Sequence, residues 1–113
     1  MQIDNIKVLL ENEGIKGTIT IGSLLDADCI GLFATVGQSP TMYFDNTMLE
    51  KPGLQVLVRN KSYEKAYETI REIYKILNKQ VGFNPSQSPF YIGRSENGYA
   101  EFSVNYIVYI EEN

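Results

Sequence analysis

The 113-residue sequence contains no histidine and a single cysteine, Cys29, and these two shortages exclude several kinds of active site. A Ser-His-Asp triad or a Cys-His pair needs an imidazole as its base, so neither can form. One cysteine cannot close an intrachain disulfide, and without histidine it cannot complete a structural zinc site. A lone thiol within an apolar stretch is typical of a small buried residue, which is the role expected for Cys29.

The chain also lacks the patterns that hold phosphate groups or calcium. Neither G-x-G-x-x-G nor GK followed by Ser or Thr occurs. Paired carboxylates such as Asp26 with Asp28, in an expected loop, or Glu111 with Glu112, at the end of the sequence, could in principle do acid–base work, but solvated charge is their expected role. Asp45 adds another carboxylate, but without EF-hand spacing. The sequence therefore predicts no enzyme activity, no cofactor and no metal site.

Excess positive charge and long apolar runs are missing too. The net charge is −4, and the Lys and Arg residues are scattered, whereas nucleic-acid-binding surfaces cluster them. The eight tyrosines therefore do not indicate a base-stacking platform. The sequence contains no run of 18 apolar residues, so it predicts no membrane-spanning helix. It also has no basic region followed by an apolar run, the pattern of a secretory signal. We expect one soluble domain, residues 1–113, that buries about two-thirds of its surface and is made in a reducing cytoplasm.

Hydrophobic periodicity predicts two helices. Residues 2–13 carry apolar side chains at helical spacing, and Gly14 follows as the residue after the C-cap. Residues 62–79 form the clearest helix, with Ser62 as its N-cap. One continuous apolar stripe runs along it: Tyr63, Ala66, Tyr67, Ile70, Ile73, Tyr74 and Leu77.

Short apolar or alternating stretches predict strands over residues 18–21, 29–36 and 54–59. Between the last two lies "GQSPTMYFDNTMLEKPG", residues 37–53, with glycine and proline at both ends and no steady period. This composition predicts a long structureless loop, a feature that is uncommon in a compact domain and often functional.

The pair Asn97-Gly98 predicts a β-hairpin closed by a two-residue type I′ turn. That turn would place Arg94 opposite Glu101 and Gly93 opposite Phe102. The side chains that then point to the core are Phe102, Val104, Tyr106, Val108 and Ile110.

The last strand offers apolar side chains to both of its faces, and the expected long loop adds more. The candidate interface residues are Phe90, Ile92, Ile107 and Tyr109 on the outward side of the hairpin, and Met42, Tyr43, Phe44, Met48 and Leu49 in the loop. Apolar groups beyond one small core usually mark a protein–protein surface. In the alternative interpretation, the loop folds back over the sheet and buries these groups within one subunit. A separate alternative function is a small ligand- or peptide-binding α+β module, for which residues 37–53 would be a lid.

Three stretches carry a resemblance to a known family: "IGLFATVG" (30–37), "VRNKSYEKAYETI" (58–70) and "PFYIGRSENGYAEFSVNYIVYI" (89–110). In this order and at this chain length they resemble the small minor capsid proteins of tailed bacteriophages, a group similar to tail terminators. The resemblance covers most of residues 28–111 and finds nothing family-specific in residues 1–27.

The resemblance implies an α+β subunit, with two helices on one face of a mostly antiparallel sheet of about four strands. It also implies a virion protein, assembled in the bacterial cytoplasm, whose copies form a ring, typically a hexamer, at the head–tail junction. Such a ring ends tail-tube growth, contacts the tail tube protein and a head-completion or connector protein, and lets DNA pass through its lumen without specific binding. No catalytic residue comes with the family. One face of the last strand would then pack on the helices, and a neighbouring protein would cover the other.

Overall fold

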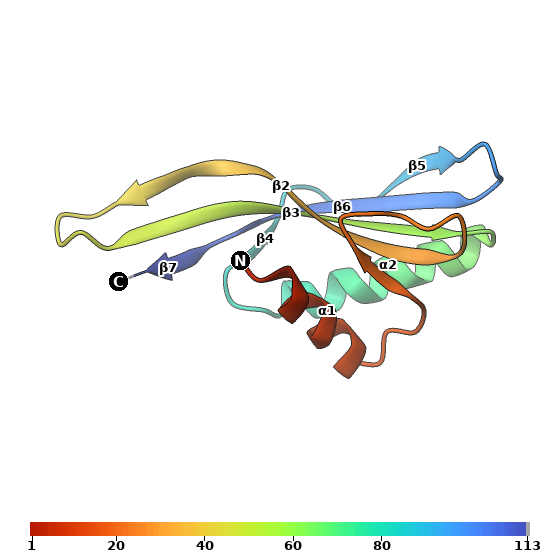
Figure 1. The fold of residues 1–113 in the computed structure, drawn as a ribbon, viewed down its shortest axis with the longest axis horizontal. Helices are drawn as coiled ribbons and strands as arrows, with labels where there is room; N and C mark the ends of the chain where they lie inside the picture. The colour runs from red at the N-terminus through yellow and green to blue at the C-terminus, as the bar shows by residue number, and fades with distance from the viewer. Residues whose placement is uncertain (113) are drawn as a thin grey trace.

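The computed structural model describes residues 1–112, which form an α+β fold with two helices beside one mixed sheet (Figure 1). The elements in chain order are α1 (Ile3–Asn12), β1 (Ile19–Ile21), β2 (Cys29–Met42), β3 (Met48–Asn60), α2 (Tyr63–Asn78), β4 (Phe83–Pro85), β5 (Phe90–Arg94), β6 (Ala100–Val108) and β7 (Ile110–Glu112). The α+β class is confirmed. The expected sheet of about four strands was too small, because the described residues contain seven.

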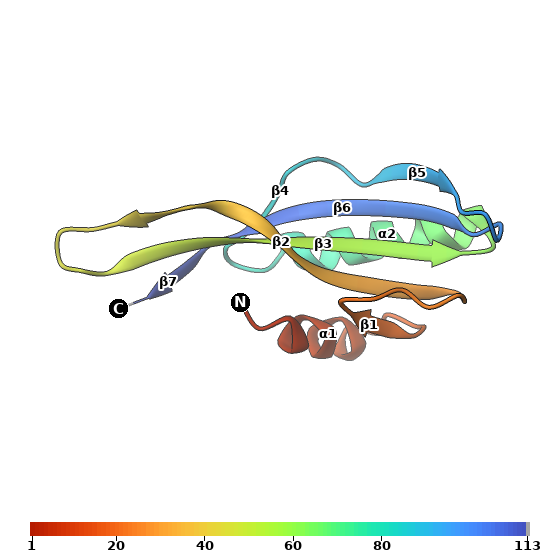
Figure 2. The same ribbon diagram turned by 45° about the horizontal axis from the view of Figure 1, so that its top comes forward.

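The central path of the sheet runs β1-β2-β3-β6-β4, while β5 also pairs with β6 and β7 with β3. The β1–β2 pair is parallel, and the other pairs are antiparallel. Both helices lie on the same side of this sheet (Figure 2). We call that side the helix face and the opposite side the open face.

The two helices are confirmed within a residue or two of their expected ends. Ser62 caps α2 by accepting a hydrogen bond from the Lys65 amide at 3.3 Å. At the end of α1, Gly14 has a φ of +89°, and the amide of Ile15 donates to the carbonyl of Leu10 at 3.0 Å. This is the Schellman geometry that a glycine after the C-cap permits.

The core lies between the helices and the helix face of the sheet. Alternation places Leu54, Val56 and Val58 of β3 on this face, as the sequence predicted, and all three are buried. The same cluster receives Leu32 from β2, Ile6 and Leu10 from α1, Ala66, Ile70, Ile73 and Leu77 from α2, and Val104, Tyr106 and Val108 from β6. Cys29 is buried, as expected, and Ile110 is partly buried against the cluster.

Two local predictions were wrong. Residues 37–53 are not a structureless loop, because β2 and β3 pair with each other out to Met42 and Met48. The turn at Asn97-Gly98 is not a two-residue turn, because Arg94 lies opposite Ala100 and Gly93 opposite Glu101. The carboxylate of Glu101 instead pairs with Arg59 of β3.

Candidate protein–protein interface

The most prominent surface feature is a β-hairpin arm that projects from the body, at the left of Figure 1. The arm consists of β2 beyond Thr35, β3 before Gly53, and β7, which pairs with β3 from Met48 to Glu50. The whole molecule is consequently elongated, with extents of 52 × 27 × 22 Å. Two β-bulges in β2, between Thr35 and Gln38 and between Gln38 and Thr41, add twist to the arm.

The tip of the arm is a three-residue turn held by its own backbone. The amide of Tyr43 donates to the carbonyl of Thr47, and the amide of Asn46 donates to the carbonyl of Tyr43, both at 3.1 Å. Asn46 has a φ of +68°, a left-handed conformation that asparagine tolerates. The Asp45 carboxylate accepts hydrogen bonds from the hydroxyl and the amide of Thr47, and these hold the pKa of Asp45 below its usual value. The tip therefore carries a fixed negative charge.

The root of the arm is a close contact between two glycines and the facing strands. A Cβ atom added to Gly37 would lie 1.9 Å from the carbonyl oxygen of Lys51, and one added to Gly53 would lie 2.3 Å from the Thr35 hydroxyl oxygen. Both positions therefore require glycine if the paired strands β2 and β3 are to approach each other this closely. The arm leaves the body at a tightly packed joint.

The structure places the nine candidate interface residues in three locations. Met42, Tyr43 and Phe44 are exposed at the arm tip, with Phe44 fully in solvent, and Met48 and Leu49 are half-buried beside them. Ile107, half-buried, and Tyr109, exposed, lie near the arm root, where Gly53 pairs with Ile107 and the Lys51 ammonium lies 5.4 Å from the centre of the Tyr109 ring. Phe90 and Ile92 are exposed on β5, beside the opposite end of β6.

The open face of the sheet is partly covered by its own chain. Leu24 and the Phe33 ring both lie over Gly31, where a Cβ atom would come within 2.7 Å of each. In the middle of this face, the Gln55 side chain donates to the Ser103 hydroxyl at 3.1 Å, and Ser103 is fully buried. The apolar side chains of this face that are at least partly exposed include Phe33, Leu57, Phe90 and Ile107.

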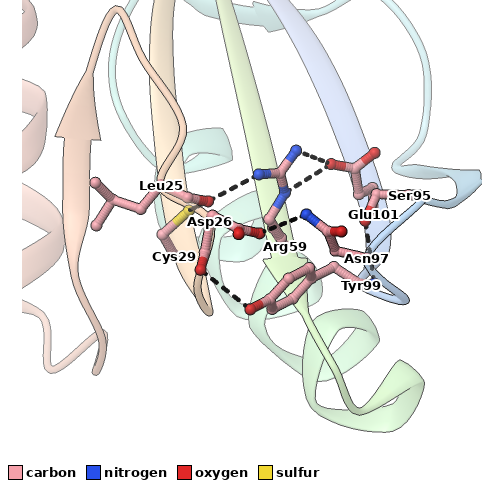
Figure 3. Close-up of polar contacts among 8 residues, drawn as sticks. All are labelled: Leu25, Asp26, Cys29, Arg59, Ser95, Asn97, Tyr99 and Glu101. Atoms are coloured by element: carbon pink, nitrogen blue, oxygen red, sulfur yellow. Dashed lines mark hydrogen bonds and ion pairs between the residues drawn. The ribbon is translucent and has the colours of Figure 1, made fainter.

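A polar cluster closes the end of the sheet opposite the arm (Figure 3). Arg59 donates to the Glu101 carboxylate through Nη2 at 2.7 Å and Nε at 2.9 Å, and to the Leu25 carbonyl through Nη1 at 2.7 Å. Asp26 accepts from the Asn97 side-chain amide at 2.8 Å, and its carbonyl accepts from the Tyr99 hydroxyl at 3.2 Å. These contacts fasten the loop before β2 to the β5–β6 hairpin, so the cluster has a structural role.

The acidic side chains of the described residues, 1–112, were compared with the requirements of a metal site. No group of three or more Cys, Asp or Glu side chains in this range could hold a metal ion. The carboxylates of Asp26, Asp28 and Glu101 are each occupied by hydrogen bonds to nearby groups of the chain. In the same described range, no helix is long and apolar enough to cross a membrane.

A hollow of the described surface lies between the body and the arm. This groove, of about 600 Å³, runs between the start of α1, the α2–β4 turn and the β6–β7 junction. Its apolar lining includes Ile6, Val81, Phe83, Val108 and Ile110. Val81 is fully exposed and was not recognised from the sequence, because the groove is built from three segments far apart in the chain.

Comparison with known families identifies the chain. Residues 9–112 match the family model described as bacteriophage tail terminator protein. The chain belongs to this family. The resemblance to tail terminators drawn from three short stretches is confirmed, and the match also includes residues 9–27, where the sequence had shown nothing family-specific. No curated protein matches the chain.

As a tail terminator family member, the chain is a structural, tail-related phage protein. This places the candidate interface in an assembly context, because a structural protein acts through the proteins it contacts.

Proposed function

We propose that copies of this protein form a ring, sixfold in the particle, that caps the tail tube, ends its growth and joins it to the head. The observation that carries this function is the arm, whose tip exposes Met42, Tyr43 and Phe44. A paired and bulged projection that exposes apolar side chains at its tip favours a contact with another protein, since these tip residues are not part of the core of their own subunit.

The partners of such a ring are further copies of the chain, the tail tube protein and a head-completion or connector protein. The half-exposed apolar groups of the open face, Phe33, Leu57, Phe90 and Ile107, give each copy a second surface for these contacts. The net charge of −4 suits a lumen through which DNA passes without being held. The site of action is the head–tail junction of the virion.

The alternative function, a ligand-binding module with residues 37–53 as its lid, is not favoured. This segment is paired strand to strand out to Met42 and Met48 and projects away from the body (Figure 2). A lid would have to fold over a pocket of its own subunit, which the rigid pairing of β2 with β3 opposes.

The function is tested by infection with a phage that lacks this gene, with or without the wild-type chain supplied from a plasmid. We expect tail tubes of irregular, excessive length and no joined heads without the protein. Tubes of uniform length with a ring at one end should return when it is supplied. Uniform, head-joined tails in its complete absence would contradict the proposal.

A further inference from the structure

We propose that the arm tip of one copy inserts into the groove at the arm base of the next copy, so that the ring is held by successive arm-in-groove contacts. This inference rests on the proposed ring and adds the residues that hold its subunits together. It follows from a protruding apolar group and an apolar hollow that occur on one chain at two different places.

The protruding part is rigid and has little contact with its own body. Phe44 is the first residue of the three-residue turn, and Met42 precedes the turn with 64% of its surface exposed. The pairing of Met42 with Met48 and of Met48 with Glu112 keeps the tip extended. An aromatic side chain carried on a preorganised hairpin loses little conformational entropy on binding, which is the property of an interface anchor.

The hollow has the size and lining that such an anchor needs. Its volume of about 600 Å³ exceeds the space of one phenylalanine and one methionine side chain, and falls within the usual range of binding sites. Val81 of the α2–β4 turn, Phe83 of β4 and Ile110 of β7 offer apolar surface to this hollow, since Val81 is exposed and the other two are half-buried. Gln2, Asn5 and Glu111 add polar groups to the lining, so the hollow suits an occupant that has both an apolar side chain and polar backbone or side-chain groups beside it, as the arm tip has.

A copy cannot fill its own groove with its own tip. The groove extends along β7 to Glu111, which pairs with Leu49, while the paired strands hold the tip extended beyond Met42 and Met48, roughly 17 Å from Gly53 at 3.3 Å per residue. The root at Gly37 and Gly53 is too tightly packed to fold the arm back. The tip of one copy can therefore fill only the groove of another copy. Such a head-to-tail contact closes into a ring when the rotation that relates successive subunits allows it.

Charge at the groove is compatible with this occupant. The Lys51 ammonium lies over the ring of Tyr109, which lines the groove, and Asp45 next to Phe44 carries the negative charge of the tip. Glu111 also lines the groove, so the proposed contact requires the Asp45 carboxylate to lie nearer Lys51 than Glu111.

The area available predicts a weak pairwise contact. The exposed apolar surface of the tip amounts to roughly 400 Å², taking 150–250 Å² for a large side chain. With an equal area from the groove, one contact buries roughly 800 Å², below the 1,200–2,000 Å² of stable complexes. Each copy in a ring makes two such contacts, so subunits associate weakly in pairs and hold together in the closed ring.

The test is disulfide cross-linking in assembled tails. Cysteines are introduced as Phe44→Cys at the tip and Val81→Cys in the groove, both at exposed positions where substitution leaves the core intact, while the native Cys29 is buried. Met42→Cys with Val81→Cys is a second pair. The matched control keeps Phe44→Cys and replaces Val81→Cys by Val8→Cys, an exposed valine of α1 that does not line the groove.

Under mild oxidation we expect a ladder of covalent multimers up to the full ring for the two tip–groove pairs, removed by reductant, and none for the control. Rings visible by electron microscopy without cross-linking of either pair would overturn this inference and leave the proposed function standing. Dimers from Phe44→Cys alone would show a symmetric tip-to-tip contact and would also overturn it. Tails that end without any ring would overturn the proposed function, and the inference with it.

Discussion

Asn46 at the arm tip and Gly98 in the β5–β6 hairpin occupy the same position of the same kind of turn. Each is the third loop residue, with φ of +68° and +82°. In each turn the flanking residues are joined by an amide-to-carbonyl bond, from Tyr43 to Thr47 and from Ser95 to Tyr99. This is the three-residue hairpin loop in which a type I turn is followed by a left-handed residue.

The arm tip should therefore respond to substitution at Asn46 according to backbone conformation. Asn46→Gly should leave the arm unchanged or slightly stabilised, whereas Asn46→Val should destabilise it by about 1–2 kcal/mol, because a β-branched residue resists positive φ. Hydrogen exchange of the arm amides measures the difference, with α2 amides as the internal reference. Equal protection in the two variants would contradict the left-handed geometry.

The root of the arm should depend on Gly37. Gly37→Ala should force the strands apart at Lys51 and destabilise the arm by about 1–3 kcal/mol, as overpacking does elsewhere. Its neighbour Val36, almost fully exposed, provides the matched control Val36→Ala, which should have no effect. Hydrogen exchange along β2 and β3 distinguishes local loosening of the arm from global unfolding. Unchanged protection of Met42 and Met48 in Gly37→Ala would show that the root tolerates a side chain.

The polar cluster of Figure 3 should stabilise the end of the sheet through Arg59. Arg59→Ala should lower the free energy of unfolding by about 1–3 kcal/mol, because it removes charge-assisted bonds to Glu101 and to the Leu25 carbonyl. Arg59→Lys should recover part of this loss, since lysine keeps the charge but not the fork geometry. Urea denaturation measures both. A wild-type midpoint for Arg59→Ala would show that the cluster contributes little.

Tyr106 should make stability fall at alkaline pH. Burial raises the pKa of its hydroxyl well above the ordinary value of 10.0. The hydroxyl therefore stays protonated in the folded protein while it ionises in the unfolded chain, so its contribution is complete below pH 10 and is lost as the pH rises above it.

Tyr106→Phe removes this titration and also the hydrogen bond from Tyr106 to the Asn78 side-chain oxygen, 2.9 Å long. We expect the variant to be less stable than wild type by about 0.5–1.5 kcal/mol at pH 8. The difference in free energy of unfolding between wild type and Tyr106→Phe should narrow or reverse above pH 10. Urea denaturation across this range measures it, and a gap that is constant with pH would contradict the assignment.

Much of the body could be predicted from the sequence because local patterns determine it. The helical stripe from Tyr63 to Leu77 fixed α2, and the alternation of Leu54, Val56 and Val58 fixed the buried side of β3. The Asn97-Gly98 pair signalled a hairpin, but Glu96 joins the loop, and a local bulge between Tyr91 and Gly93 shifts the register further. The number of loop residues depends on how β5 pairs with β6, and the Asn97-Gly98 dipeptide carries no information on that pairing.

The arm was missed because its sequence carries the usual signals of a loop. Gly37, Pro40, Pro52 and Gly53 all lie within strands: Gly37 and Pro52 face each other across a bulge, and Pro40 lies at the second one. Bulges also break the two-residue alternation that identifies a strand. Exposure of Met42 and Phe44 followed from the excess of apolar residues over one core, whereas the groove depends on tertiary packing and has no local signature.

The central claim is that the exposed arm tip acts in ending tail growth, and one measurement tests it most directly. Tail tubes made with Phe44→Asp should be compared by electron microscopy with tubes made with wild type and with Val8→Asp, after confirming equal urea midpoints for all three chains. The account predicts tubes of irregular length without a terminal ring for Phe44→Asp, and uniform, head-joined tails for the other two. Uniform, joined tails made with Phe44→Asp would contradict it.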